Sequence, residues 1–154
     1  MDGTLFQTDK ILELALEDTF DRLRSQGEWK EAAPVEKYRE IMGVPLKEVW
    51  KVLLPHHSDE IREQINDYFQ ERLIENIKNG KGALYPNAVE VLSFLKENNC
   101  SIYIASNGLP HYLKAIVSHY HLDAWVTETF SIEQIESINK GDLVKTILQK
   151  YHIT

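Results

Sequence analysis

The sequence is poor in cysteine, with Cys100 as its single example among 154 residues. One cysteine excludes an internal disulfide, and it excludes a zinc site built on several thiolates. We interpret Cys100 as a small apolar side chain beside a strand rather than as a reactive thiol. This usage is typical of a reducing compartment, so we expect a cytoplasmic location.

Positive charge and long apolar runs are also scarce. The chain has 17 basic and 24 acidic residues, which gives a formal net charge of -7. Such a balance provides no basic stripe that could follow a nucleic-acid backbone. The chain has no run of about 18 apolar residues, and its first residues lack the basic and apolar parts of a secretion signal. We therefore expect no nucleic-acid partner and no membrane insertion.

Residues 10–81 show apolar side chains at the spacing typical of helices. Apolar residues recur at helical spacing in residues 10–24, and Gly27 follows as a stop signal. Residues 46–54 place their apolar side chains on one helical face between two prolines. Ser58 can cap a further helix, whose first turn carries two acidic residues. This part of the chain is predicted to be all helical.

The pattern changes in residues 82–154. Residues 87–97 are predicted to form a helix with Val91 among its inward side chains, and "SIYIAS" is typical of a buried parallel strand. A helix is expected from Pro110, a second strand within 125–131, and a last helix in "GDLVKTILQKY". An order of helix, strand, helix, strand, helix predicts an α/β fold with an open sheet.

Three places in the chain have side chains suited to phosphate chemistry. "MDGTLFQTD" carries Asp2 in a turn-forming context, which is a weak signal alone. "IYIASNG" ends a predicted strand in Ser106, Asn107 and Gly108, whose hydroxyl and backbone N–H groups could donate to phosphate oxygens. Lys140, in "SINKGDLVK", precedes a predicted helix and could supply a fixed positive charge.

Together with "YREIMGVPLKEVW" and "LYPNAVEVLSFLKENNCSIYIASNG", these motifs resemble the haloacid dehalogenase superfamily of phosphohydrolases. The likeness is to its helical-cap branch, which includes phosphoglycolate phosphatase and β-phosphoglucomutase. The first motif of that family is an apolar strand followed by Asp-x-Asp-Gly-Thr-Leu, and this chain matches it from the middle position onward. The chain departs from the family pattern at Asn87, where Gly is usual, and at Gly141, where Pro often follows the lysine.

The resemblance implies an α/β fold with an incomplete Rossmann-like core and a helical cap. It divides the chain into a first-motif loop at residues 1–9, a cap at residues 10–81, and a partial core at residues 82–154. The core segment would carry the second and third motifs.

The resemblance also implies phosphoryl transfer through an aspartyl-phosphate. Asp2 matches the acid/base aspartate, and Lys140 matches the catalytic lysine of the third motif. Ser106, Asn107 and Gly108 match the phosphate-binding loop. Mg²⁺ is the implied cofactor, and the backbone carbonyl of Asp2 is the one usual protein ligand that residues 1–154 can provide.

Two parts of the family machinery are expected to lie outside these residues. The nucleophilic aspartate would come directly before Met1, and the acidic fourth motif would follow Thr154. We therefore expect a truncated member with weak or absent Mg²⁺ binding and no aspartyl-phosphate turnover. The missing strands would leave sheet edges exposed, which favours self-association.

Three functions follow as hypotheses. A full-length relative would be an Mg²⁺-dependent phosphatase of a small phosphorylated metabolite, with the cap setting its specificity. One alternative is a non-catalytic module that binds a phosphate ester or a partner. The other is a phosphosugar mutase, which product analysis would distinguish.

Overall fold

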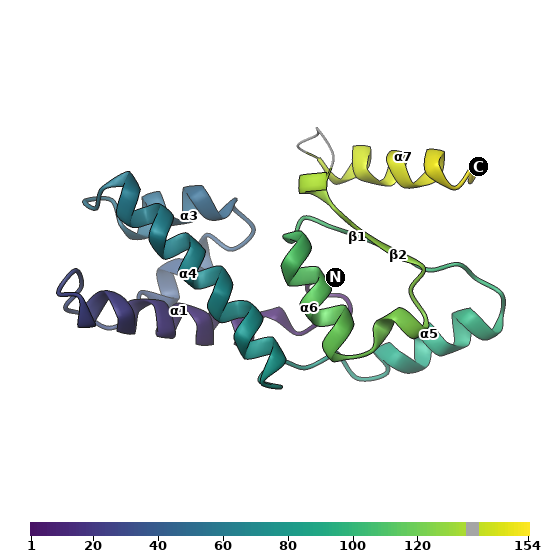
Figure 1. The fold of residues 1–154 in the computed structure, drawn as a ribbon, viewed down its shortest axis with the longest axis horizontal. Coiled ribbons are helices and arrows are strands. Elements are labelled where there is room, and N and C mark those ends of the chain that lie inside the picture. The colour runs from purple at the N-terminus through teal and green to yellow at the C-terminus, as the bar shows by residue number, and fades with distance from the viewer. Residues whose placement is uncertain (135–138) are drawn as a thin grey trace. The chain divides into compact units, whose positions relative to one another are not determined.

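The computed structural model describes residues 1–134 and 139–154. Its contacts divide the chain into two compact units (Figure 1). The helical unit comprises Asp9–Asn76, and the α/β unit comprises Met1–Thr8 together with Ile77–Thr154. Each unit is described by itself below.

The helical unit contains helices whose ends follow local sequence signals. Ser58 caps the last of them, because its Oγ accepts a hydrogen bond from the Ile61 N–H at 3.3 Å. Gly27 ends the first, with a φ of +77° that suits a residue without a Cβ. The helices are α1 (Thr8–Ser25), α2 (Val35–Glu40), α3 (Leu46–Leu53) and α4 (Asp59–Lys78).

Trp50 on α3 lies at the centre of the helical unit's apolar core. Its side chain is 1% exposed, and its ring meets that of Phe69 edge-on at a centroid distance of 5.3 Å. The indole N–H donates to Asn66 Oδ1 at 2.9 Å, so the buried polar edge of the ring is satisfied. Tyr38 from α2 also packs edge-on against Phe69. The helical periodicity predicted for this stretch is therefore confirmed.

The α/β unit is built around a pair of parallel strands, β1 and β2. Their register pairs Tyr103 with Glu128 and Ser106 with Ser131, so both strands end at the same edge. Within the described ranges, these two strands make up the sheet. Its elements are α5 (Ala88–Glu97), β1 (Tyr103–Ser106), α6 (Pro110–His119), the 3-10 turn Leu122–Ala124, β2 (Glu128–Ser131), the 3-10 turn Ile132–Gln134 and α7 (Lys140–Lys150).

This order confirms the predicted α/β fold class. On one face of the strand pair, α7 packs Leu143 and Ile147 against Phe130, with Tyr103 and Tyr151 beside them. The helix α6 forms the crossover between β1 and β2. In Figure 1, α6 and α7 lie on opposite sides of the strands, as a parallel sheet requires.

The start of α5 accounts for one departure from the family pattern. Asn87, which stands where Gly is usual, adopts a φ of +66° directly before the helix. Left-handed backbone favours glycine, but asparagine is among the few other residues that adopt it readily. Asparagine at this position is therefore compatible with the left-handed backbone that leads into α5.

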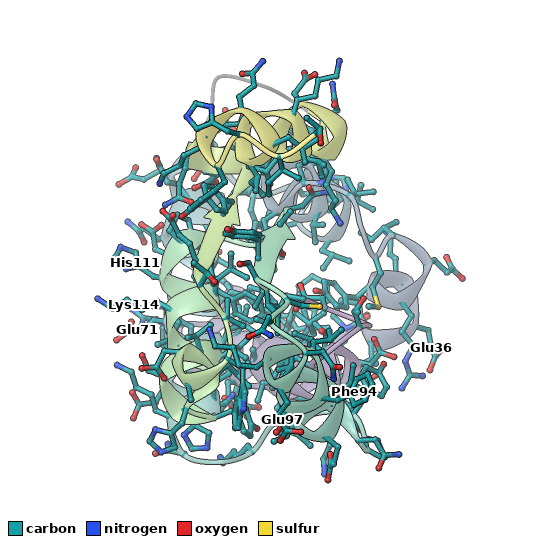
Figure 2. All side chains as sticks on the ribbon, turned by 90° about the vertical axis from the view of Figure 1, so that its right-hand side faces the viewer. Glu36, Glu71, Phe94, Glu97, His111 and Lys114 are labelled. Atoms are coloured by element: carbon teal, nitrogen blue, oxygen red, sulfur yellow. The ribbon has the colours of Figure 1, made fainter. Side chains whose placement is uncertain are left out.

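Two predictions about burial in this unit are wrong. Val91, predicted to point inward, is 53% exposed, and Phe94 on the same face of α5 is 63% exposed (Figure 2). The buried side chains of this helix are those of Ala88 and Leu92, which lie on a neighbouring face. Cys100 is exposed rather than packed beside a strand.

None of the helices in residues 1–134 and 139–154 combines the length and the apolar character needed to cross a membrane.

Candidate functional site

The first residues of the chain form a tight loop around the Met1 carbonyl. That oxygen accepts hydrogen bonds from the N–H groups of Thr4, Leu5 and Phe6 at 3.2, 2.9 and 3.2 Å. Gly3 has a φ of +70°, so the turn favours a residue without a Cβ at this position. The loop holds Asp2 at its surface, where the carboxylate is exposed.

The loop is fastened to the segment that leads into α5. The Gln7 N–H donates to the Ala83 carbonyl at 2.8 Å, and the Tyr85 N–H donates to the Leu5 carbonyl at 2.9 Å. Phe6, between these bonds, is fully buried. The position of Asp2 is therefore determined by residues that lie about 80 positions away in the sequence.

Tyr112 is the side chain that orients the Asp2 carboxylate. Its hydroxyl donates to Asp2 Oδ1 at 2.7 Å, and the tyrosine itself is 6% exposed. Tyr112 lies in the first turn of α6, and its ring meets that of Phe6 edge-on at 6.5 Å. Tyr112 is absent from the site residues predicted from the sequence. Its position shortly after the Ser106 loop was the available signal, but a buried tyrosine more often packs than binds.

Ser106, Asn107 and Gly108 form the turn that follows β1. Ser106 is 4% exposed, and its Oγ accepts the Gly108 N–H at 3.1 Å. In the described part of the chain, no hydrogen bond uses the Ser106 hydroxyl proton, so this proton can be donated to a ligand. Asn107 is exposed at the tip of the turn.

Gly108 lies where space is short. A Cβ at this position would lie 3.1 Å from the Tyr112 ring and 3.3 Å from Ser106 Oγ. The Gly108 carbonyl also accepts a hydrogen bond from Ser131 Oγ at 2.6 Å, which links the turn to the end of β2. Glycine therefore allows the Ser106 turn to approach the tyrosine that holds Asp2.

Lys140 is the first residue of α7, and its side chain is exposed. The Asn139 Oδ1 accepts the Asp142 N–H at 2.9 Å and caps this helix. Burial lowers the pKa of the Met1 α-amino group, the charge of Asp2 opposes that shift, and the charge of Lys140 adds to it. Ser137 and Ile138, which belong to the third motif, lie outside the described residues.

The structure thus connects the candidate residues to different degrees. Tyr112 donates to Asp2, and Gly108, whose N–H donates to Ser106, lies so close to Tyr112 that an added Cβ would be 3.1 Å from its ring. Lys140 is exposed at the start of α7, and its charge acts on the Met1 α-amino group.

The donor set around Asp2 does not fit Mg²⁺. Magnesium favours sites with carboxylate ligands in octahedral geometry. In residues 1–134 and 139–154, no group of three acidic, histidine or cysteine side chains could hold a metal ion. One oxygen of the Asp2 carboxylate already accepts the Tyr112 hydroxyl. The residues described here therefore do not form a magnesium site by themselves.

Solved structures share this fold at low sequence identity. CbbY from Rhodobacter sphaeroides, in complex with phosphate, superposes with a TM-score of 0.78 at 18% identity, covering 99% of this chain and 70% of that one. A CbbY mutant in complex with xylulose-(1,5)bisphosphate gives a TM-score of 0.77 at 17% identity, with the same coverage. A haloacid dehalogenase-like family hydrolase from Streptococcus pneumoniae gives 0.71 at 18% identity, covering 99% and 68%.

A search of the curated proteins found no match. The model of one protein family, described as haloacid dehalogenase-like hydrolase, matches residues 1–153. That match includes the Asp2 loop, the Ser106 turn and the start of α7, and it agrees with the fold comparison. The chain belongs to the haloacid dehalogenase-like hydrolase family.

Proposed function

We propose that the chain binds the phosphate group of a small phosphorylated metabolite at Asp2, Ser106 and Lys140. The observation that carries this proposal is the hydrogen bond from Tyr112 to Asp2, made by a tyrosine whose ring lies close to Gly108 in the Ser106 turn. Family membership supports the same assignment. In this arrangement, a hydroxyl donor, a carboxyl group and a lysine belong to one α/β unit.

Each of these side chains has a role that its environment permits. The Ser106 hydroxyl and the Asn107 N–H donate to phosphate oxygens, while the Gly108 N–H holds Ser106 Oγ in place. The Lys140 ammonium neutralises the phosphate charge. Tyr112 holds the Asp2 carboxyl in one orientation. In a full-length relative with a nucleophile, this carboxyl would protonate the leaving oxygen and then activate water.

We further propose that residues 1–154 bind a phosphate ester without turning it over. Of the side chains assigned to this site, Asp2 is the one with a carboxylate, and it has the acid/base role. No side chain of the proposed site is then left to attack phosphorus. For a full-length relative, we propose Mg²⁺-dependent phosphatase activity. The second candidate is a module whose function is only to bind a phosphate ester or a partner. The presence of a single carboxylate in the proposed site favours this candidate.

The substrate class that we propose is a sugar phosphate. CbbY, whose fold is similar, has been solved with phosphate and with xylulose-(1,5)bisphosphate. We also propose that the helical unit is the cap that sets specificity. An exposed, unpaired Cys100 is consistent with the cytoplasmic location that we propose.

The open edge of β1 supports a further proposal, that copies of the chain self-associate. Within the described residues, β1 pairs with β2 alone. Its other edge can accept a strand, and exposed apolar side chains on α5, including Val91 and Phe94, lie in the same unit.

Phosphate binding is tested by isothermal titration with inorganic phosphate and a sugar monophosphate. We expect Ser106→Ala to weaken binding because the hydroxyl donor is lost, and Ser118→Ala, an exposed position on α6, to leave it unchanged. Unchanged affinity in Ser106→Ala would contradict the binding proposal. Hydrolysis of p-nitrophenyl phosphate with Mg²⁺ that is lost in Asp2→Ala would contradict the absence of turnover.

A further inference from the structure

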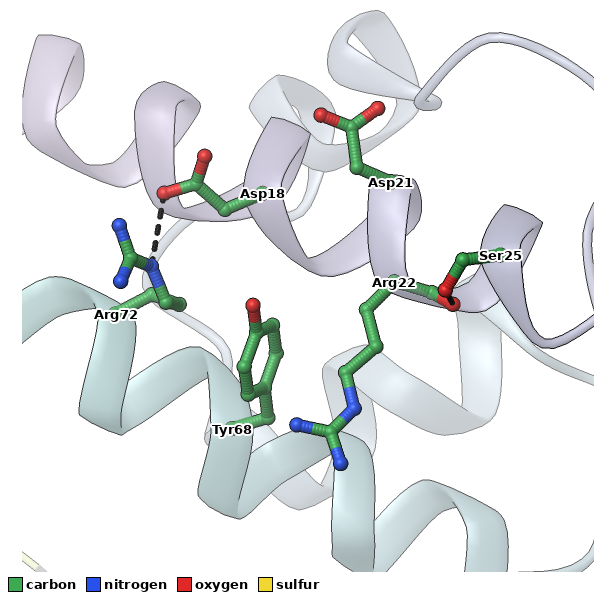
Figure 3. A pocket seen from close by; sticks show the side chains of 6 residues that line it. All are labelled: Asp18, Asp21, Arg22, Ser25, Tyr68 and Arg72. Atoms are coloured by element: carbon green, nitrogen blue, oxygen red, sulfur yellow. Dashed lines mark hydrogen bonds and ion pairs between the residues drawn. The ribbon is translucent and has the colours of Figure 1, made fainter.

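A hollow in the helical unit lies between α1 and α4, and it shares no residue with the proposed phosphate site. Its volume is about 540 Å³, and it is open to solvent. Figure 3 shows the side chains that α1 and α4 contribute to it. The lining residues are Asp18, Asp21, Arg22, Ser25, Tyr68 and Arg72.

The two carboxylates of the hollow already have cationic partners. Asp18 Oδ2 accepts from Arg72 Nε at 3.1 Å and from Asn76 Nδ2 at 3.2 Å. Asn76 is fully buried, so this network is held rigidly. Asp21 is paired with Arg24. The hollow therefore contains two neutralised carboxylates and no excess negative charge.

Arg22 differs from the other four arginines of the chain. Each of the others forms an ion pair with an aspartate or glutamate, whereas Arg22 forms none in the described ranges. Its guanidinium carbon instead lies over the Tyr68 ring, 4.3 Å from the centroid. Stacking of this kind fixes the plane of the guanidinium and leaves its N–H groups free at the rim.

We propose that Arg22 and Tyr68 bind the carboxylate of a small organic acid. A guanidinium presents paired N–H donors that match a carboxylate, and its stacking on an aromatic ring reduces the entropy lost on binding. The Tyr68 hydroxyl points from α4 toward α1 and has no hydrogen-bond partner among the described residues, so it offers a second polar contact along the ring (Figure 3).

The overall charge of the chain favours a monoanion over phosphate. Asp18 and Asp21 are neutralised by their arginine partners. The formal net charge of -7 remains, and it repels a phosphate dianion about twice as strongly as a carboxylate. This site is independent of the phosphate proposal, because none of its lining residues belongs to the Asp2, Ser106 and Lys140 set.

The test uses the whole chain and two probes, sodium benzoate and inorganic phosphate, at constant ionic strength set with sodium chloride. Binding is followed by NMR through the Arg22 side-chain N–H signal and the Tyr68 ring signals. We expect saturable shifts with benzoate, tighter apparent binding of benzoate than of phosphate at these signals, and no saturable shift with chloride.

Three variants sharpen the test. Arg22→Gln and Tyr68→Leu should each weaken benzoate binding, the former by about tenfold or more, which corresponds to about 1.4 kcal/mol. Arg39→Gln, which removes an exposed and ion-paired arginine of the same unit, should leave it unchanged. Circular dichroism checks that each variant is folded.

Several outcomes would overturn the proposal. Benzoate affinity that is unchanged in Arg22→Gln would show that Arg22 does not bind benzoate. Equal NMR shifts with chloride would show that the signals respond to salt in general and not to a bound carboxylate. Tighter phosphate than benzoate binding at Arg22 would contradict the carboxylate assignment. If Arg22→Gln does not fold, Tyr68→Leu replaces it in the test. Unchanged benzoate affinity in Tyr68→Leu would then overturn the proposal.

Discussion

The helical unit and the α/β unit leave different apolar side chains exposed. In the helical unit, the large hydrophobic side chains that are exposed lie on α3 or in the loop before it, and they are Met42, Val44 and Val52. In the α/β unit, exposed apolar side chains extend along α5 and α7 and include Val91, Phe94, Val144 and Leu148. The first unit covers its main apolar faces, and the second leaves several of them open.

The physical reason is that helices and parallel strands differ in where their backbone hydrogen bonds are formed and in how many of their faces must be covered. Helices form most of their backbone hydrogen bonds internally, so a few helices can enclose a core such as that around Trp50. A parallel strand needs a neighbour on each edge and a covered face on each side. The pair β1 and β2 provides one paired edge for each strand. Four experiments test this contrast, from the largest expected effect to the smallest.

Trp50→Ala should give the largest loss of stability. Removal of a buried tryptophan costs about 3–5 kcal/mol in the free energy of unfolding, and here the Asn66 hydrogen bond is lost as well. Val52→Ala on the same helix is the control, because Val52 is 38% exposed. Denaturant unfolding followed by circular dichroism measures both. Equal losses in the two variants would show that the helical unit does not depend on this core.

Gly82→Ala should destabilise the α/β unit by overpacking. A Cβ at this position would lie 2.5 Å from Phe6 Cζ, so the buried ring must shift. Such a clash costs about 1–3 kcal/mol. Denaturant unfolding measures the loss, and Phe6→Leu should relieve part of it in the double variant. Strict additivity of the two changes would contradict the clash.

High pH should weaken the cluster of Glu128, Lys150 and Tyr151, which joins β2 to the end of α7. The Tyr151 hydroxyl donates to Glu128, and Lys150 Nζ lies 2.8 and 2.9 Å from the two carboxylate oxygens. The hydrogen bond to Glu128 raises the pKa of Tyr151 from 10.0 to about 12. Because the folded state holds this proton more tightly, its stabilising contribution is complete below pH 10 and is lost as the pH rises through about 12.

Absorbance of tyrosinate during an alkaline titration measures this effect. One of the seven tyrosines should titrate near pH 12 in the wild type. Its pKa should be lower in Glu128→Gln, and unchanged in Glu90→Gln, which alters an exposed side chain on α5. An unchanged high-pH step in Glu128→Gln would assign the shift to another cause.

Phe94→Ser should have the smallest effect on folding and a clear effect on association. The side chain is 63% exposed, so the free energy of unfolding should change by about 0.5 kcal/mol or less. Sedimentation velocity over a range of concentrations should show less self-association than in the wild type. Glu97→Ser, on the same helix, is the control (Figure 2). Unchanged association would leave α5 outside any interface.

Much of the fold could be predicted from local patterns. The spacing of apolar residues predicts α1 closely, and Gly27 follows it as the expected stop signal. The Ser58 cap and the acidic first turn predict the start of α4. Short-range sequence determines helices because their hydrogen bonds join residues four positions apart. The inward side of α5 was predicted wrongly at Val91, because periodicity identifies apolar positions without showing which of them have a neighbour.

The candidate site was less accessible to sequence reasoning. Asp2, Ser106 and Lys140 were chosen by residue type and motif, but nothing in those motifs pairs Asp2 with Tyr112, which is 110 positions away. In the same way, charges at helical spacing on α1 and α4 are typical of solvated faces. Only the packing of the two helices brings Arg22 onto the Tyr68 ring.

By itself, the sequence determined the class of the longer helices and of the two strands, the α/β order of the second half, and the residue types available for phosphate chemistry. The tertiary structure alone decided which side chains meet: Tyr112 with Asp2, Phe6 beneath Gly82, and Arg22 on Tyr68. Periodicity and caps act over a few residues through backbone hydrogen bonds. Contacts between distant residues depend on how whole elements pack, and that packing is a property of the folded chain.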